Sequence, residues 1–97
     1  MKKGYWVISY RTVGDEATMK NYSALAGEAL GQFGMRLLAS PKSAVTAREA
    51  GLEKMTVVVE FDSYEMAQAA YESADYKKAL AALGPGVERD VRIVEGV

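Results

Sequence analysis

The order of secondary-structure patterns constrains the fold of this chain more than any other feature of its sequence. Short apolar and β-branched runs alternate with amphipathic stretches in the order strand, helix, strand, and this order then repeats. Two such units joined by right-handed crossovers give an antiparallel sheet of order 4-1-3-2 with the helices on one face. The length of 97 residues suffices for one domain, residues 1–97. The sequence therefore predicts an α+β fold, a two-layer βαββαβ sandwich.

Periodicity and capping residues define the individual elements. Asp15 offers an N-cap oxygen to a helix whose apolar residues recur at three- and four-residue steps up to Phe33. Ser73 is expected to cap a further helical segment directly after the second helix. An extension of the second strand over Ala44–Ala47 is expected before a turn near Gly51. The predicted strands are Tyr5–Tyr10, Met35–Ala39, Met55–Phe61 and Val91–Val94, and the second helix covers Tyr64–Glu72.

Alternation along the third strand indicates which face of the sheet meets the helices. Its apolar row is formed by Met55, Val57, Val59 and Phe61, whereas Glu60 belongs to the opposite row. That opposite row, with the aromatic first strand and the β-branched fourth strand, leaves an apolar face that no helix covers. The sequence therefore predicts a homodimer formed through this face. A monomer with an adhesive surface is the alternative that remains open.

Two absent residue types exclude much of enzyme chemistry. The chain has no cysteine and no histidine, so thiolate nucleophiles, histidine bases and the common zinc and iron ligand sets are lacking. We therefore expect no metal and no cofactor. The 12 basic and 13 acidic side chains argue against a nucleic-acid partner. No apolar run is long enough for a membrane span or a signal peptide, which favours a soluble, cytoplasmic protein.

Glu60 is the acidic residue most deeply embedded in an apolar strand. Burial would raise the pKa of its carboxyl group and make Glu60 a candidate base or ligand-binding group. Arg36 on the second strand is the first choice as its neutralising partner, and Arg92 on the fourth strand is the second. A structural ion pair at a subunit contact is the competing interpretation, and the sequence favours it.

Tyr22, Tyr71 and Tyr76 lie at helix positions that are able to face the sheet. Phenol side chains in a cleft bind planar molecules and donate protons to oxyanions, so these three are candidate ligand-binding residues. Tyrosines at such positions more often belong to the core with the hydroxyl at its edge, and this is the alternative. The sequence contains no phosphate-binding glycine loop.

Five segments along the chain form a recognisable set. They are Lys3–Trp6, Gly34–Leu38, Val59–Glu65, Tyr71–Tyr76 and Ile93–Gly96. Together they resemble the DUF1330 family of domains of unknown function, which belongs to the dimeric α/β-barrel superfamily. The resemblance covers nearly the whole chain and implies ferredoxin-like subunits whose sheets face each other across a dimer. The superfamily includes cofactor-independent monooxygenases, muconolactone isomerases and stress-response dimers, but no catalytic residue of these is recognisable here.

Two functions compete at this point. The first is a small enzyme or binder acting without metal or cofactor on a planar or enol-type metabolite. It would use the cleft between sheet and helices, with Tyr22, Tyr71 and Tyr76 near the ligand and Glu60 or Arg36 supplying polarity. The second is a non-catalytic dimeric binding or stress-related module. An RNA-binding domain fits worse, because the third strand carries a glutamate and no basic residue.

Overall fold

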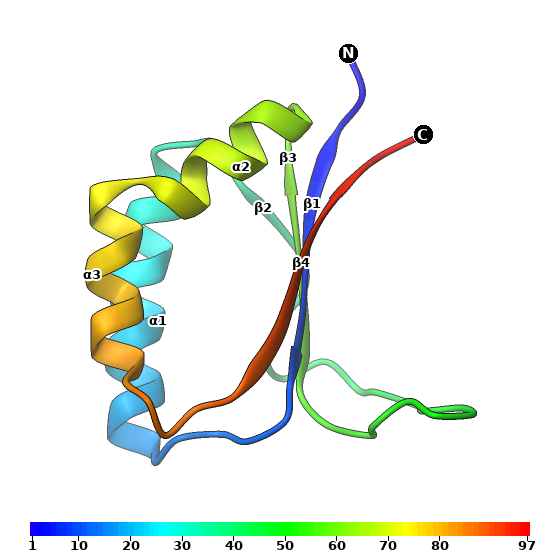
Figure 1. Cartoon of the computed structure of the whole chain (residues 1–97), viewed down its shortest axis with the longest axis vertical. Helices are drawn as coiled ribbons and strands as arrows, with labels where there is room; N and C mark the ends of the chain where they lie inside the picture. The colour runs from blue at the N-terminus through cyan, green and yellow to red at the C-terminus, as the bar shows by residue number, and fades with distance from the viewer.

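The computed structural model describes residues 1–97 as one sheet with one layer of helices (Figure 1). The strands pair antiparallel in the order β2-β3-β1-β4, which is the predicted order counted from the other edge. All three helices lie on the same face of the sheet (Figure 1). The elements are β1 Gly4–Tyr10, α1 Glu16–Gly31, β2 Arg36–Ala39, β3 Thr56–Phe61, α2 Tyr64–Glu72, α3 Ala74–Leu83 and β4 Arg89–Glu95.

The helices begin where the capping side chains predict. The Asp15 carboxylate accepts a hydrogen bond from the backbone N–H of Thr18 at 2.8 Å, which fixes the start of α1. The Ser73 hydroxyl ends α2 by donating to the Ala70 carbonyl at 2.8 Å, and it starts α3 by accepting from the N–H of Tyr76 at 3.2 Å. One serine therefore divides the second helical region into two helices, as expected.

The predicted extension of the second strand over Ala44–Ala47 is wrong, because β2 ends at Ala39. The N–H of Ser40 donates to the Ser43 hydroxyl at 2.9 Å, and the N–H of Ser43 donates to the Ser40 carbonyl, so the chain turns around Pro41. Ala39 already pairs with Val58 near the start of β3. Residues 44–47 therefore have no strand beside them to extend the sheet, and they form part of the long loop between β2 and β3.

The inner face of the sheet forms the core with the helices. Trp6, Phe61 and Tyr76 are its largest fully buried side chains. The Trp6 indole N–H donates to the Ala67 carbonyl on α2 at 2.8 Å, and its ring packs at 4.9 Å from that of Tyr76. A Cβ at Gly4 would lie 2.5 Å from the Ser63 carbonyl. Glycine at this position therefore allows the start of β1 to approach α2.

The outer face of the sheet carries a mixed surface. Val7 and Val58 are direct neighbours across β1 and β3, and Tyr5 pairs with Glu60 on the same strands. Val94 on β4 and Leu38 on β2 are exposed. A register shift between Leu37 and Ala39 places Leu38 at a bulge in β2. No helix covers this face (Figure 1), as the strand alternation predicts.

Candidate functional site

A cavity of about 630 Å³ lies between α1 and the inner face of the sheet. This volume falls in the usual range of small-molecule sites, about 300–1,000 Å³. Twelve of the 18 residues that line it are hydrophobic. The sheet supplies Trp6, Ile8, Tyr10, Leu37, Val57 and Val59; α1 supplies Glu16, Met19, Lys20, Tyr22, Ser23, Ala26, Gly27 and Leu30; the remaining residues are Met35, Pro41, Lys42 and Met55.

Small residues on α1 explain why the cavity stays open. α1 packs mainly against α3 rather than directly on the sheet, so its sheet-facing side chains determine how much of the space is filled. Ser23, Ala26 and Gly27 are small and lie between the larger Met19 and Leu30. The cavity therefore keeps free volume between mostly apolar walls, which suits a flat apolar molecule.

Two tyrosines and an arginine form a cluster beside the cavity, and we call Tyr22, Tyr76 and Arg89 the phenol–arginine cluster. The hydroxyl oxygens of the two tyrosines are 2.6 Å apart. The Arg89 guanidinium donates to the Tyr22 hydroxyl at 3.0 Å and to the Tyr76 hydroxyl at 3.2 Å. It also lies over the rings of Tyr10 and Tyr22, at 5.6 and 5.2 Å from their centroids.

Burial determines the protonation of this cluster. Burial raises the pKa of Tyr22 well above its usual range, more than the nearby Arg89 charge lowers it. Burial lowers the pKa of the Arg89 guanidinium, but the oxygens of Tyr22 and Tyr76 more than offset this and raise it overall. At neutral pH the Tyr22 phenol is therefore protonated and the Arg89 guanidinium is cationic.

Arg89 was not among the residues singled out in the sequence, and a simple signal would have found it. Strand alternation places residue 89 on the same face as Val91 and Ile93. β4 begins at Arg89, two residues before the predicted start, and Arg89 pairs with Tyr10. An arginine in phase with an apolar strand row is therefore directed toward the core.

The three predicted tyrosines occupy different positions. Tyr22 lines the cavity, and Tyr76 is fully buried behind it and reaches it only through their shared hydrogen bond. Tyr71 is half-buried and packs against the rings of Trp6 and Tyr76 at 5.6 and 5.3 Å, away from the cavity wall. Of the three, only Tyr22 is in a position to touch a ligand in the cavity.

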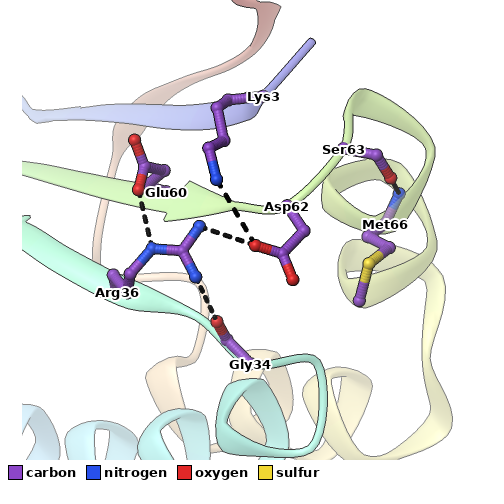
Figure 2. A network of polar contacts seen from close by, with 7 residues as sticks. All are labelled: Lys3, Gly34, Arg36, Glu60, Asp62, Ser63 and Met66. Carbon is purple, nitrogen blue, oxygen red and sulfur yellow. Dashed lines mark hydrogen bonds and ion pairs between the residues drawn. The ribbon is translucent and has the colours of Figure 1, made fainter. Parts of the chain in front are cut away.

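Arg36 and Glu60 lie on the outer face of the sheet in a second polar group, the Arg36 network, with Lys3 and Asp62 (Figure 2). The Arg36 Nε donates to Glu60 Oε1 at 2.7 Å, and Nη2 donates to Asp62 Oδ1 at 2.9 Å. Lys3 Nζ is 3.5 Å from Asp62 Oδ1. The Glu60 side chain is 18% exposed and that of Arg36 is 42% exposed. The predicted ion pair between Arg36 and Glu60 is therefore present.

The idea that Glu60 is a base with a raised pKa is wrong. Hydrogen bonding from Arg36 lowers the pKa of Glu60 and outweighs the desolvation that raises it. The same arginine lowers the pKa of Asp62. Arg92, the second choice as partner, instead donates to Asp90 at 3.1 Å. The structure therefore separates Arg36 and Glu60 from the tyrosines by the thickness of the sheet.

A family model for the domain of unknown function DUF1330 matches residues 3–97. The chain belongs to the DUF1330 family. No curated protein matches it in sequence. None of its helices has the length and apolar character needed to cross a membrane. No group of three or more acidic, histidine or cysteine side chains converges in this DUF1330 structure to hold a metal ion.

Solved structures share the fold of this DUF1330 protein at low sequence identity. A protein of unknown function from Rhodopseudomonas palustris has a TM-score of 0.67 at 8% identity, with 99% of this chain and 83% of that chain covered. SnoaB, a cofactor-independent oxygenase from Streptomyces nogalater, has a TM-score of 0.64 at 12% identity, with coverage of 97% and 92%. A dimeric ferredoxin-like protein of unknown function from Thermobifida fusca has a TM-score of 0.62 at 13% identity, with coverage of 97% and 91%. These similarities establish a ferredoxin-like fold.

Proposed function

We propose that this DUF1330 protein binds a small planar, enol-type metabolite in the cavity between α1 and the sheet, and transforms it without metal or cofactor. One observation carries the proposal, namely a mostly apolar cavity of about 630 Å³ that is lined by the Tyr22 side chain, whose hydroxyl is held in place by Tyr76 and Arg89. A flat apolar ligand fills such a space, and one fixed polar group orients it. The fold shared with a cofactor-independent oxygenase supports a function of this kind.

The cavity offers enol-type ligands both contact area and a hydrogen bond. Trp6 and Tyr10 line it as buried aromatic side chains, and Met19 and Met55 add flexible thioethers that adapt to irregular shapes. The protonated Tyr22 hydroxyl donates to a carbonyl or enolate oxygen. Such a donor stabilises negative charge that develops on that oxygen once the bound ligand has displaced water. This is the chemistry that a site without histidine or cysteine is able to perform.

Trp6 provides a direct test, because it lines the cavity and is the only tryptophan in the chain. Its fluorescence is expected to change on titration with planar hydroxyquinones and hydroxynaphthoates. Gly27 lines the cavity, and a Cβ added there meets nothing within 4 Å, so Gly27→Phe places a ring at the wall. Gly31→Phe, one turn later and outside the cavity, is the matched control. The proposal fails if Gly27→Phe and Gly31→Phe bind such ligands as the wild type does.

A binding module without catalysis is the second candidate. Glu16, at the exposed start of α1, is the one carboxylate among the residues that line the cavity. Glu60, the other candidate base, is ion-paired on the opposite face. Recovering a tightly bound ligand unchanged after prolonged incubation in air would favour the binding module, whereas its conversion would favour the enzyme.

We further propose that two subunits assemble as a dimeric α/β barrel through the outer face. Val7 and Val58 form an apolar pair on the two central strands, and no helix covers the outer face of the sheet. The similar structure from Thermobifida fusca is described as dimeric. A stable interface of this type buries at least ~1,200 Å² in total. Light scattering coupled to gel filtration is expected to give twice the chain mass of 10.5 kDa, and a monomer at micromolar concentration would refute the dimer.

A further inference from the structure

The half-buried guanidinium of Arg89 has no carboxylate partner. Its hydrogen bonds go to the hydroxyls of Tyr22 and Tyr76, and it takes part in none of the ion pairs of the chain. The acidic neighbour Asp90 is engaged by Arg92 at 3.1 Å. A partly desolvated cation that lacks an anion attracts one, because a low-dielectric surrounding strengthens the attraction between charges.

Counting protons in the phenol–arginine cluster shows where such an anion would bind. Arg89 only donates, so both phenol oxygens act as acceptors toward it. The bond between Tyr22 and Tyr76 uses one of the two phenol protons. The other proton has no acceptor within the cluster. Tyr76 is fully buried, whereas Tyr22 lines the cavity, so the arrangement that uses both protons has Tyr76 donating to Tyr22 and Tyr22 donating into the cavity.

We propose that the cavity takes its ligand as an anion, with an ionised enol or phenol oxygen accepting the hydrogen bond of Tyr22 and facing the charge of Arg89 behind it. This inference rests on the proposed function and specifies its substrate class, namely planar molecules with an acidic hydroxyl. The ligand loses its proton to solvent on binding. The pKa of Tyr22 is raised, so that its hydroxyl remains a donor beside the bound anion.

The other ionisable groups around the cavity agree with this preference. Lys20 on α1 and Lys42 in the loop after β2 line the cavity, against the single carboxylate of Glu16. Tyr10 on β1 lies beneath the Arg89 guanidinium, and burial raises its pKa, so it remains neutral. The ionisable groups in contact with the Tyr22 side chain are therefore one phenol, Tyr76, and one cation, Arg89.

A pair of probes separates this inference from the proposed function. 4-Nitrophenol ionises to a form that absorbs visible light, whereas 4-nitroanisole has nearly the same shape and no acidic proton. Binding of 4-nitroanisole, measured by equilibrium dialysis, tests the cavity alone. A spectroscopic pH titration of bound 4-nitrophenol measures its pKa and tests the preference for the anion. We expect a pKa lowered by about one unit on binding, which corresponds to a tenfold preference for the phenolate.

Variants assign the effect to the cluster. Tyr22→Phe and Arg89→Gln are expected to abolish most of the pKa shift while 4-nitroanisole still binds, and Arg89→Lys is expected to retain part of it. Arg11→Gln removes an exposed positive charge just after β1 and is the matched control. If Arg89→Gln does not fold, Tyr22→Phe and Arg89→Lys still decide the question.

Three results would count against the inference. If 4-nitroanisole binds but the pKa of bound 4-nitrophenol is unchanged or raised, the anion preference is overturned and the proposed cavity stands. A shift that persists at full size in Tyr22→Phe and in Arg89→Lys would also overturn it. If neither probe binds at millimolar concentration, the proposed function and the inference fall together.

Discussion

Arg36 and Arg89 lie on opposite faces of the same sheet and have opposite surroundings. Arg36 is exposed on β2 and is neutralised by the carboxylates of Glu60 and Asp62. Arg89 is half-buried on β4, and its partners are two phenol oxygens. The first arrangement is electrostatically complete within the chain, whereas the second leaves a charge without a counter-ion. A surface on which every charge is ion-paired is suited to contact with another subunit. An unpaired charge beside a cavity is suited to binding a charged ligand.

The inner face is expected to account for most of the stability. Trp6→Ala removes a fully buried ring and the hydrogen bond to the Ala67 carbonyl, so it should lower the free energy of unfolding by about 3–5 kcal/mol. Val7→Ala, one residue later and on the outer face, is the control. Urea denaturation under conditions that keep both variants in the same oligomeric state measures the difference. An equal loss of unfolding free energy in the two variants would mean that the inner face does not account for most of the stability.

Removing one hydroxyl probes the phenol–arginine cluster directly. Tyr76→Phe leaves one Arg89 donor without its partner and removes one of the two hydrogen bonds of the Tyr22 hydroxyl, so it should cost about 1–3 kcal/mol. Tyr71→Phe is the matched control, because the Tyr71 hydroxyl takes part in none of these bonds while its ring packs against the same Trp6. Thermal unfolding of both variants compares them, and a Tyr71→Phe variant as unstable as Tyr76→Phe would contradict the assignment.

The Arg36 network and the phenol–arginine cluster should lose their contributions to stability at opposite ends of the pH range. The folded pKa values of Glu60 and Asp62 lie below those of the unfolded chain because of Arg36. Their contribution is therefore complete above about pH 4 and is lost as the pH falls through the folded values. Burial raises the pKa of Tyr22, so the unfolded chain loses this proton first and stability falls as the pH rises above about 10.

Unfolding midpoints measured from pH 2 to 11 test this asymmetry. Arg36→Gln should flatten the acidic limb and leave the alkaline limb unchanged, whereas Tyr22→Phe should do the reverse. If one variant changes both the acidic and the alkaline limb of the pH dependence, the two clusters are coupled through the sheet.

The smallest effect is expected from the Arg36 network on assembly. Arg36→Gln leaves Glu60 and Asp62 without their main partner, but exposed ion pairs contribute little to monomer stability. The proposed dimer should therefore weaken severalfold while the monomer unfolds much as the wild type does. Analytical ultracentrifugation at several salt concentrations measures the dissociation constant, and Lys77→Gln, on the exposed surface of α3, is the control. A dimer unaffected by Arg36→Gln would place the contact elsewhere.

Strand alternation made most of the fold predictable. It assigned the helix-facing row that contains Val57, Val59 and Phe61, and it placed Glu60 on the other face, where the structure shows it beside Arg36. The same alternation, applied to the candidate site, would have separated Glu60 from the helix tyrosines. The sequence prediction placed Glu60 in one site with the helix tyrosines, although the alternation puts Glu60 on the opposite face of the sheet.

Other features depended on interactions that a sequence pattern does not contain. The missing strand at Ala44–Ala47 follows from a local serine turn and from the lack of a neighbouring strand, although the residues themselves suit a strand. The pairing of Arg89 with Tyr22 and Tyr76 joins residues that are 67 and 13 positions apart. Only the completed sheet and helix layer bring their polar atoms together.

The bulge in β2 also limits how the sheet is able to grow. Edge strands present unpaired backbone groups that recruit strands of other molecules. β2 is four residues long and its register shifts at Leu38, so it offers a short and irregular edge for strand addition. At the other edge, β4 carries Asp90, Arg92 and Glu95, charges that discourage such pairing. Neither edge is therefore well suited to repeated strand addition by further molecules. Packing against the outer face of the sheet remains as the way for a second copy to bind.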